Sequence, residues 1–118
     1  MTSEISITVS QQDAASRTLA VSVPVERVKA VEAETTRWYG RQARIPGFRK
    51  GKVPEQIVRK RFGEAIRQAV LEDLVRETWK KAVEEQHLKP VADPQVRNLK
   101  FEDGAPLTFE MRVDVKPE

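Results

Sequence analysis

The sequence of 118 residues contains no cysteine, a single histidine and no long apolar run. Without cysteine, the chain forms neither a disulfide framework nor a thiolate metal site. His87 has no second histidine nearby, so the sequence predicts no metal ligation. No apolar segment approaches the roughly 20 residues that cross a membrane. Residues 1–4 lack a basic and an apolar region, so we expect no signal peptide, which is compatible with the cytosol.

Signatures of catalysis and of nucleotide binding are also missing. The carboxylates are scattered without a catalytic pair, and no serine stands in a nucleophile elbow. Three residues separate Gly47 from Gly51, and Val53 follows Lys52, so the spacing fits neither a Walker loop nor a KH loop. We therefore expect no catalytic residue, no cofactor and no metal. Aromatic residues are few, and Trp38 and Trp79 are predicted to pack in the core or between helices.

What the chain does have is strongly uneven charge. Residues 37–61 hold nine lysines and arginines against one acid, Glu55, which gives this segment +8 and leaves −5 for the rest of the net +3. A charge run is usually a solvated helix face, but here the acids that accompany such a face are nearly absent. Arg37, Arg41 and Arg44 share one helix face by their spacing. The segment is therefore predicted to attract phosphate backbones or acidic protein surfaces.

Hydrophobic periodicity predicts an α+β fold. Alternating apolar residues indicate strands near 5–9, 19–23, 96–101 and 107–115, and helical spacing indicates helices at about 25–44, 54–62 and 64–86. Gly63 is expected to end the shorter second helix. Pairs of strands that bracket the helices favour an antiparallel four-stranded sheet packed by two long helices. A helix–loop–helix then projects its tip away from the sheet, and the 118 residues form one domain.

The most informative segment is the octapeptide at residues 47–54, Gly-Phe-Arg-Lys-Gly-Lys-Val-Pro. Its two glycines permit positive φ, and Pro54 suits the start of a helix. Such a loop presents Phe48, Arg49 and Lys50 outward, which favours docking on an anionic surface with an apolar hollow. From physics alone, Phe48 could equally fold back onto the helices as a staple.

All eight positions of this segment match the ribosome-docking signature of trigger factor, a family of bacterial ribosome-associated chaperones that the whole chain resembles. The resemblance implies a single ribosome-binding domain over residues 1–118. The family's full-length members add a peptidyl-prolyl isomerase domain and a helical, arm-bearing domain, which 118 residues cannot hold. The resemblance therefore implies no isomerase activity for residues 1–118. For the full-length family it implies roles in protein folding, export and cell division.

The resemblance also implies partners and roles. The implied partners are nascent chains and the large ribosomal subunit, which the domain would contact through a protein at the polypeptide exit tunnel and the adjacent rRNA. The implied location is cytoplasmic and ribosome-associated, with no membrane partner. The implied ribosome-binding residues all lie in the octapeptide: Gly47, Phe48, Arg49, Lys50, Gly51, Lys52 and Pro54. The implied electrostatic support for rRNA comes from the flanking helices: Arg37, Arg41, Arg44, Arg59, Lys60 and Arg61.

Two alternatives from other classes stay open. The basic helical hairpin could belong to an RNA-binding module that recognises phosphate backbone. An apolar sheet or helix face could instead make a self-associating domain, a weak homodimer.

Overall fold

A computed structural model describes residues 5–116, so the prediction for residues 1–4 lies outside the described residues. The chain forms β1 (Ser6–Gln12), β2 (Ser16–Val23), α1 (Val25–Gln42), α2 (Glu55–Glu85), β3 (Gln95–Lys100) and β4 (Leu107–Asp114). The four strands make one antiparallel sheet in the order β1-β2-β4-β3. The predicted antiparallel four-stranded α+β fold is confirmed.

The two central strands supply one wall of the core. In β2 and β4 every second side chain is buried, as their alternating sequences predict. The register pairs Leu19 with Met111 and Val21 with Phe109, so their side chains lie on the same face. β3 differs, because all six of its residues are exposed and its register with β4 shifts around Asn98, whose φ is +53°.

The helices differ in detail from the prediction. α1 ends at Gln42, two residues earlier than expected, and the two helices predicted on either side of Gly63 form one helix of 31 residues. In place of the predicted break at Gly63, α2 has a kink at Phe62, whose φ is −114° and ψ is 18°. An isolated glycine weakens a helix by about 1 kcal/mol, which tertiary packing on both sides overrides here.

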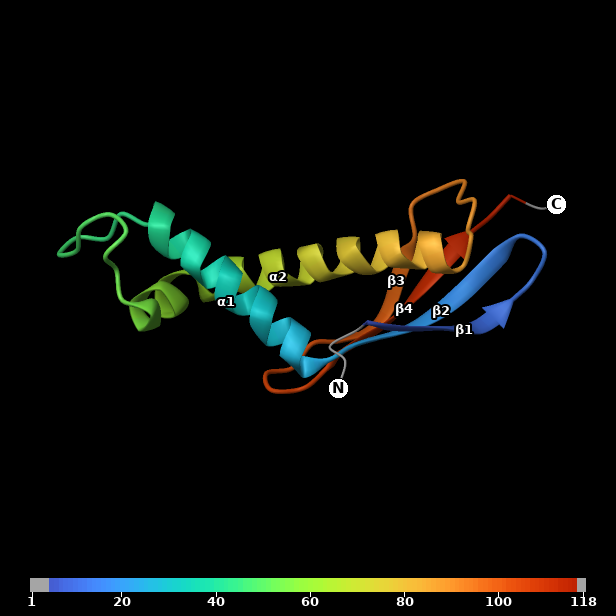
Figure 1. Cartoon of the computed structure of the whole chain (residues 1–118), viewed down its shortest axis with the longest axis horizontal. Helices are drawn as coiled ribbons and strands as arrows, with labels where there is room; N and C mark the ends of the chain where they lie inside the picture. The colour runs from blue at the N-terminus through green and yellow to red at the C-terminus, as the bar shows by residue number, and fades with distance from the viewer. Residues whose placement is uncertain (1–4, 117–118) are drawn as a thin grey trace.

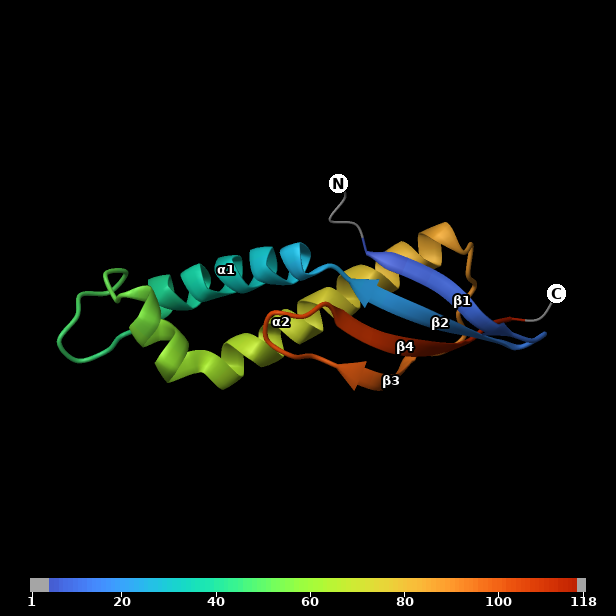
Figure 2. The same ribbon diagram turned by 90° about the horizontal axis from the view of Figure 1, so that it is seen from below.

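The molecule is long, with extents of 61 × 30 × 21 Å. The C-terminal half of α2 overlies the sheet, whereas α1 and the N-terminal half of α2 extend beyond it side by side (Figures 1 and 2). Arg27 of α1 and Glu77 of α2 form an ion pair at 2.9 Å where the two helices meet the sheet. The predicted projecting helix–loop–helix is therefore present, with its tip at one end of the long axis. Within residues 5–116, neither helix is apolar enough over sufficient length to cross a membrane.

The two tryptophans were both expected to be buried in packing, and for Trp38 this was wrong. Trp38 is 51% exposed, while Trp79 is partly buried against the core. The buried positions of α1 are Val28, Val31 and Thr36, followed by Ala43 just beyond the helix. This contact stripe drifts around the helix towards the tip and leaves Trp38 on the outer side.

Candidate docking site at the tip of the helical hairpin

The tip loop, residues 43–54, consists of two consecutive tight turns. The Phe48 N–H donates to the Ile45 carbonyl at 3.1 Å, and the Lys52 N–H donates to the Arg49 carbonyl at 2.9 Å. The third residue of each turn is a glycine with positive φ, +92° at Gly47 and +81° at Gly51. Each therefore has the glycine position of a type II turn, and the first also has Pro46 at the preferred position before it. The sequence fixes the shape of this loop locally.

Packing between the two helices holds the base of the loop. Tyr39 of α1 stacks on Phe62 at the kink of α2, with ring centroids 5.5 Å apart, and it also meets Trp38 edge-on at 5.1 Å. Val58 is buried beneath the loop, with Val53 partly buried against the core. The kink therefore places Phe62 against Tyr39, and packed side chains of both helices support the tip loop.

The structure places every residue of the predicted docking set on the surface. Phe48 is 41% exposed and does not belong to the core cluster, so it does not act as a buried staple. The remaining predicted residues of the loop and its flanks are exposed as well: Gly47, Arg49, Lys50, Gly51, Lys52, Pro54, Arg37, Arg41, Arg44, Arg59, Lys60 and Arg61. The set gathers around one end of the molecule, while its role in binding stays a prediction.

The cations of this set are almost all unpaired. In the described part of the chain, only Arg59 among them forms an ion pair, with Glu55 one turn earlier in α2 at 2.9 Å. By contrast, Arg27, Arg67 and Arg76 on the helices nearer the sheet all have carboxylate partners. The tip therefore carries a concentrated positive charge that the protein itself does not neutralise, as an anion-binding surface requires.

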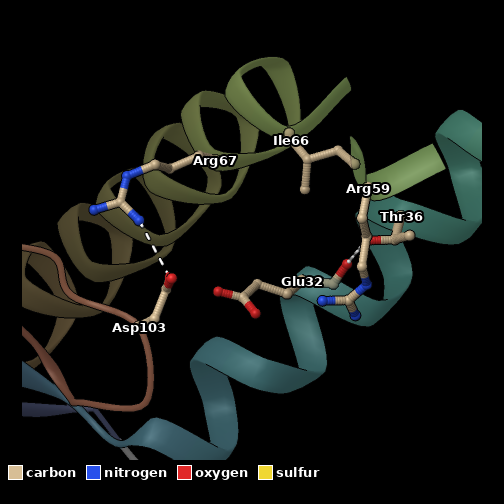
Figure 3. Close-up of a pocket in the computed structure, with 7 residues that line it drawn as sticks. Glu32, Thr36, Arg59, Ile66, Arg67 and Asp103 are labelled. Carbon is tan, nitrogen blue, oxygen red and sulfur yellow. Dashed lines mark hydrogen bonds and ion pairs between the residues drawn. The ribbon is translucent and has the colours of Figure 1, made fainter. Parts of the chain in front are cut away.

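A hollow of about 220 Å³ lies between α1, α2 and the β3–β4 turn (Figure 3). Arg67 of α2 points to the turn, where it meets Asp103 at 3.5 Å, donates to the Phe101 carbonyl and stacks 4.2 Å over the Phe101 ring. Glu32 points into the hollow from α1. The contacts of Arg67 attach the turn to α2, so we assign this hollow a structural role.

A wide apolar groove of about 480 Å³, which the sequence did not predict, lies between α2 and the edge strand β3. Its walls are Leu71, Val75 and Trp79 on the helix and Val96 and Leu99 on the strand. Val96 and Leu99 are 39% and 42% exposed. A helix about 10 Å across covers only part of a four-stranded sheet, whose strands lie about 4.8 Å apart, which leaves β3 uncovered. The helical spacing of Leu71, Val75 and Trp79 on α2 was the available signal, but the pattern alone did not show that no other element covers these side chains.

The described residues offer no metal centre, because residues 5–116 contain no group of three or more histidine, cysteine or acidic side chains that could hold an ion. His87 lies two residues beyond the end of α2 and has a φ of +51°. The tip presents exposed cations and one exposed apolar side chain, Phe48.

These features define a two-layer α+β domain that carries a basic loop on a long helical hairpin. The family described as bacterial trigger factor protein matches residues 5–118. The chain is 38% identical over 112 residues to trigger factor of Ectopseudomonas mendocina and 36% identical over 102 residues to that of Koribacter versatilis, covering 95% and 86% of this chain. The chain therefore belongs to the bacterial trigger factor family.

The match covers only part of these relatives. The chain spans 26% of the length of the first and 23% of the second. A solved structure of a trigger factor chaperone, described for promiscuous substrate recognition in folding and assembly, has a TM-score of 0.76. At 21% identity, over 96% of this chain and 27% of that one, the likeness concerns the fold.

Proposed function

We propose that this domain docks a trigger factor chaperone on the large ribosomal subunit beside the polypeptide exit tunnel. The observation that carries the proposal is the tip itself, where a partly exposed Phe48 stands among cations without ion-pair partners in the described residues. Membership of the trigger factor family supports it further. The position of the loop at the end of a 61 Å molecule leaves it free to reach a neighbouring surface.

Within this proposal, each side chain of the tip has its own role in binding the ribosome. Phe48 fills a small apolar hollow on a ribosomal protein, and Arg49 pairs with a carboxylate there, with support from Lys50. The cations on the flanking helices attract rRNA over a longer range. Arg59 contributes less than the others, because Glu55 already neutralises it.

The groove between α2 and β3 gives the domain a second role in the proposal. Its exposed Val96 and Leu99 offer apolar surface to a nascent chain near the tunnel, in the cytoplasm. We attribute no isomerase activity to residues 1–118 and place that activity in the parts of the longer relatives beyond this domain. A proline-peptide isomerisation assay on the purified domain checks this point, since catalysis above the buffer rate contradicts it.

Co-sedimentation with vacant ribosomes tests the docking role. The variant Phe48→Ala/Arg49→Ala/Lys50→Ala should lose association while its circular dichroism spectrum stays unchanged, because none of the three side chains belongs to the core. Wild-type levels of co-sedimentation by this variant would refute docking through the loop. The domain should also displace labelled full-length trigger factor from ribosomes.

The charge of the tip favours one competing function, a general RNA-binding module. Counterion release at many phosphates makes such binding fall steeply with salt. Docking through Phe48 instead predicts affinity that weakens with KCl but keeps a component that salt does not screen. Excess generic RNA separates the two, because it abolishes binding only if RNA is the sole partner. Sedimentation over a concentration series tests the weak homodimer.

A further inference from the structure

A second hollow, of about 240 Å³, lies between the end of α1, the tip loop and the start of α2. The walls come from all three elements: Arg37, Gly40, Arg41, Gly51, Val53 and Val58. Gly40 and Val58 form a close wall, because a Cβ atom added at Gly40 would lie 3.6 Å from Val58 Cγ2. We call this hollow the notch. It adjoins the loop without including Phe48, Arg49 or Lys50.

The charges around the notch are not balanced. Its one lining carboxylate, Glu55, already accepts a hydrogen bond from Arg59 Nε at 3.1 Å and forms an ion pair with Arg59 Nη2 at 2.9 Å. Arg37 and Arg41, one helical turn apart, have no ion-pair partner within residues 5–116 and are exposed. Two arginines one helical turn apart therefore line the notch, and neither has a carboxylate partner within residues 5–116.

We propose that the notch receives an aspartate or glutamate side chain of the ribosomal protein on which the tip docks. Guanidinium groups match a carboxylate through two parallel hydrogen bonds, and the aliphatic wall of Val53 and Val58 suits the methylene stem of such a side chain. A bare phosphate would gain nothing from those valines. This inference rests on the proposed docking function and adds a second anchoring point to it.

The volume agrees with an occupant of that size. At about 30 Å³ per molecule of liquid water, the notch has room for roughly eight waters, which is enough for one acidic side chain. An acidic side chain that enters here while Phe48 and Arg49 engage the same protein would fix the rotation of the tip on its partner.

The first test fills the notch. Gly40→Met should project a flexible side chain into it and weaken binding to purified large ribosomal subunits about tenfold or more, the loss expected for charge-assisted contacts. Gly40→Ala is the matched control: both substitutions raise helix propensity, but alanine leaves most of the notch open and should bind as wild type. Thermal unfolding of both variants should show no loss of stability.

The second test distinguishes the planar, two-hydrogen-bond pairing of an arginine with a carboxylate from simple attraction to its charge. Arg37→Lys/Arg41→Lys keeps the net charge and the long-range attraction but loses the planar pairing, so affinity should again fall about tenfold. Wild-type affinity in this double variant would mean that charge alone is used, as at a phosphate, and would overturn the proposal, as would full binding by Gly40→Met. Wild-type protein that fails to bind, or a loop variant that still binds, instead refutes the docking function itself.

Discussion

Truncation of Phe48 gives the sharpest quantitative expectation for this domain. A phenylalanine buries about 150–250 Å² when fully covered, so its 41% exposure leaves about 80 Å² for a partner. At about 25 cal/mol per Å², covering that area contributes about 2 kcal/mol. Phe48→Ala should therefore raise the dissociation constant for ribosomes about 30-fold, at 1.4 kcal/mol per factor of ten.

The measurement is a binding titration of labelled domain against ribosomes, paired with urea unfolding. Val91→Ala is the matched control, because Val91 is also apolar and even more exposed, at 63%, but lies away from the tip. This control should bind as wild type. Phe48→Ala should change the free energy of unfolding by less than about 0.5 kcal/mol, as is usual for exposed positions outside the core.

Two results would refute the reasoning. A change in affinity below about threefold would mean that the exposed ring area is not covered in the complex. A loss of stability of several kcal/mol would mean that Phe48 acts as a core residue, despite its place outside the buried cluster.

Three further expectations concern the backbone, the turn and pH. Gly51→Ala places a side chain at a φ of +81°, with strain of about 1–3 kcal/mol, and should reduce ribosome binding; Gly104→Ala, at +74°, carries similar strain but should only lower stability. Arg67→Ala frees the β3–β4 turn and should lower the urea-derived free energy of unfolding by about 1–2 kcal/mol without affecting binding. The pKa of Asp13 is lowered, chiefly by a hydrogen bond from the Ala15 N–H, so its contribution is present above the ordinary carboxyl pKa and lost as pH falls through the folded-state value. The Tm of the wild-type domain, measured by thermal unfolding, should therefore fall more in acid than the Tm of Asp13→Asn.

Periodicity predicted the two central strands, β2 and β4, because both follow a simple physical rule. In β4 every second residue from Leu107 to Val113 faces the core, so the alternation in the sequence is the alternation in burial. Helical spacing predicted the long part of α2 in the same way, and its buried residues include Val70, Leu74 and Thr78. The tip loop was predictable for a similar reason, since its glycine positions determine the turns.

The errors arose where two elements meet at an angle. Trp38 shares a helical face with Val31, but the contact between α1 and α2 drifts around the helix, so the two residues end in different environments. The helix break expected at Gly63 became a kink, because Phe62 packs on Tyr39 and both segments of the helix keep their contacts. A one-dimensional pattern contains no crossing geometry.

The site was predictable in composition but not in its pairing. The sequence gives nine cations against one acid, and the spacing from Glu55 to Arg59 is that of a helical ion pair. Glu55 pairs with Arg59, and Arg37 and Arg41 are left beside the hollow without a carboxylate partner in the described residues. This arrangement depends on how α1 approaches α2. The groove beside β3 escaped prediction likewise, because apolar periodicity does not reveal what covers the surface.

Much of the buried core and the proposed docking surface lie at different ends of the molecule. Leu19 and Met111 of the sheet and Leu74 of α2 are fully buried, and the tip loop with its exposed Phe48 lies at the far end of the long axis (Figure 1). Between them the hairpin is held by the Arg27–Glu77 ion pair and by aromatic packing. Because the tip contributes little to the core, its surface can match a partner with few constraints from folding. Substitutions at the tip should therefore change affinity far more than stability.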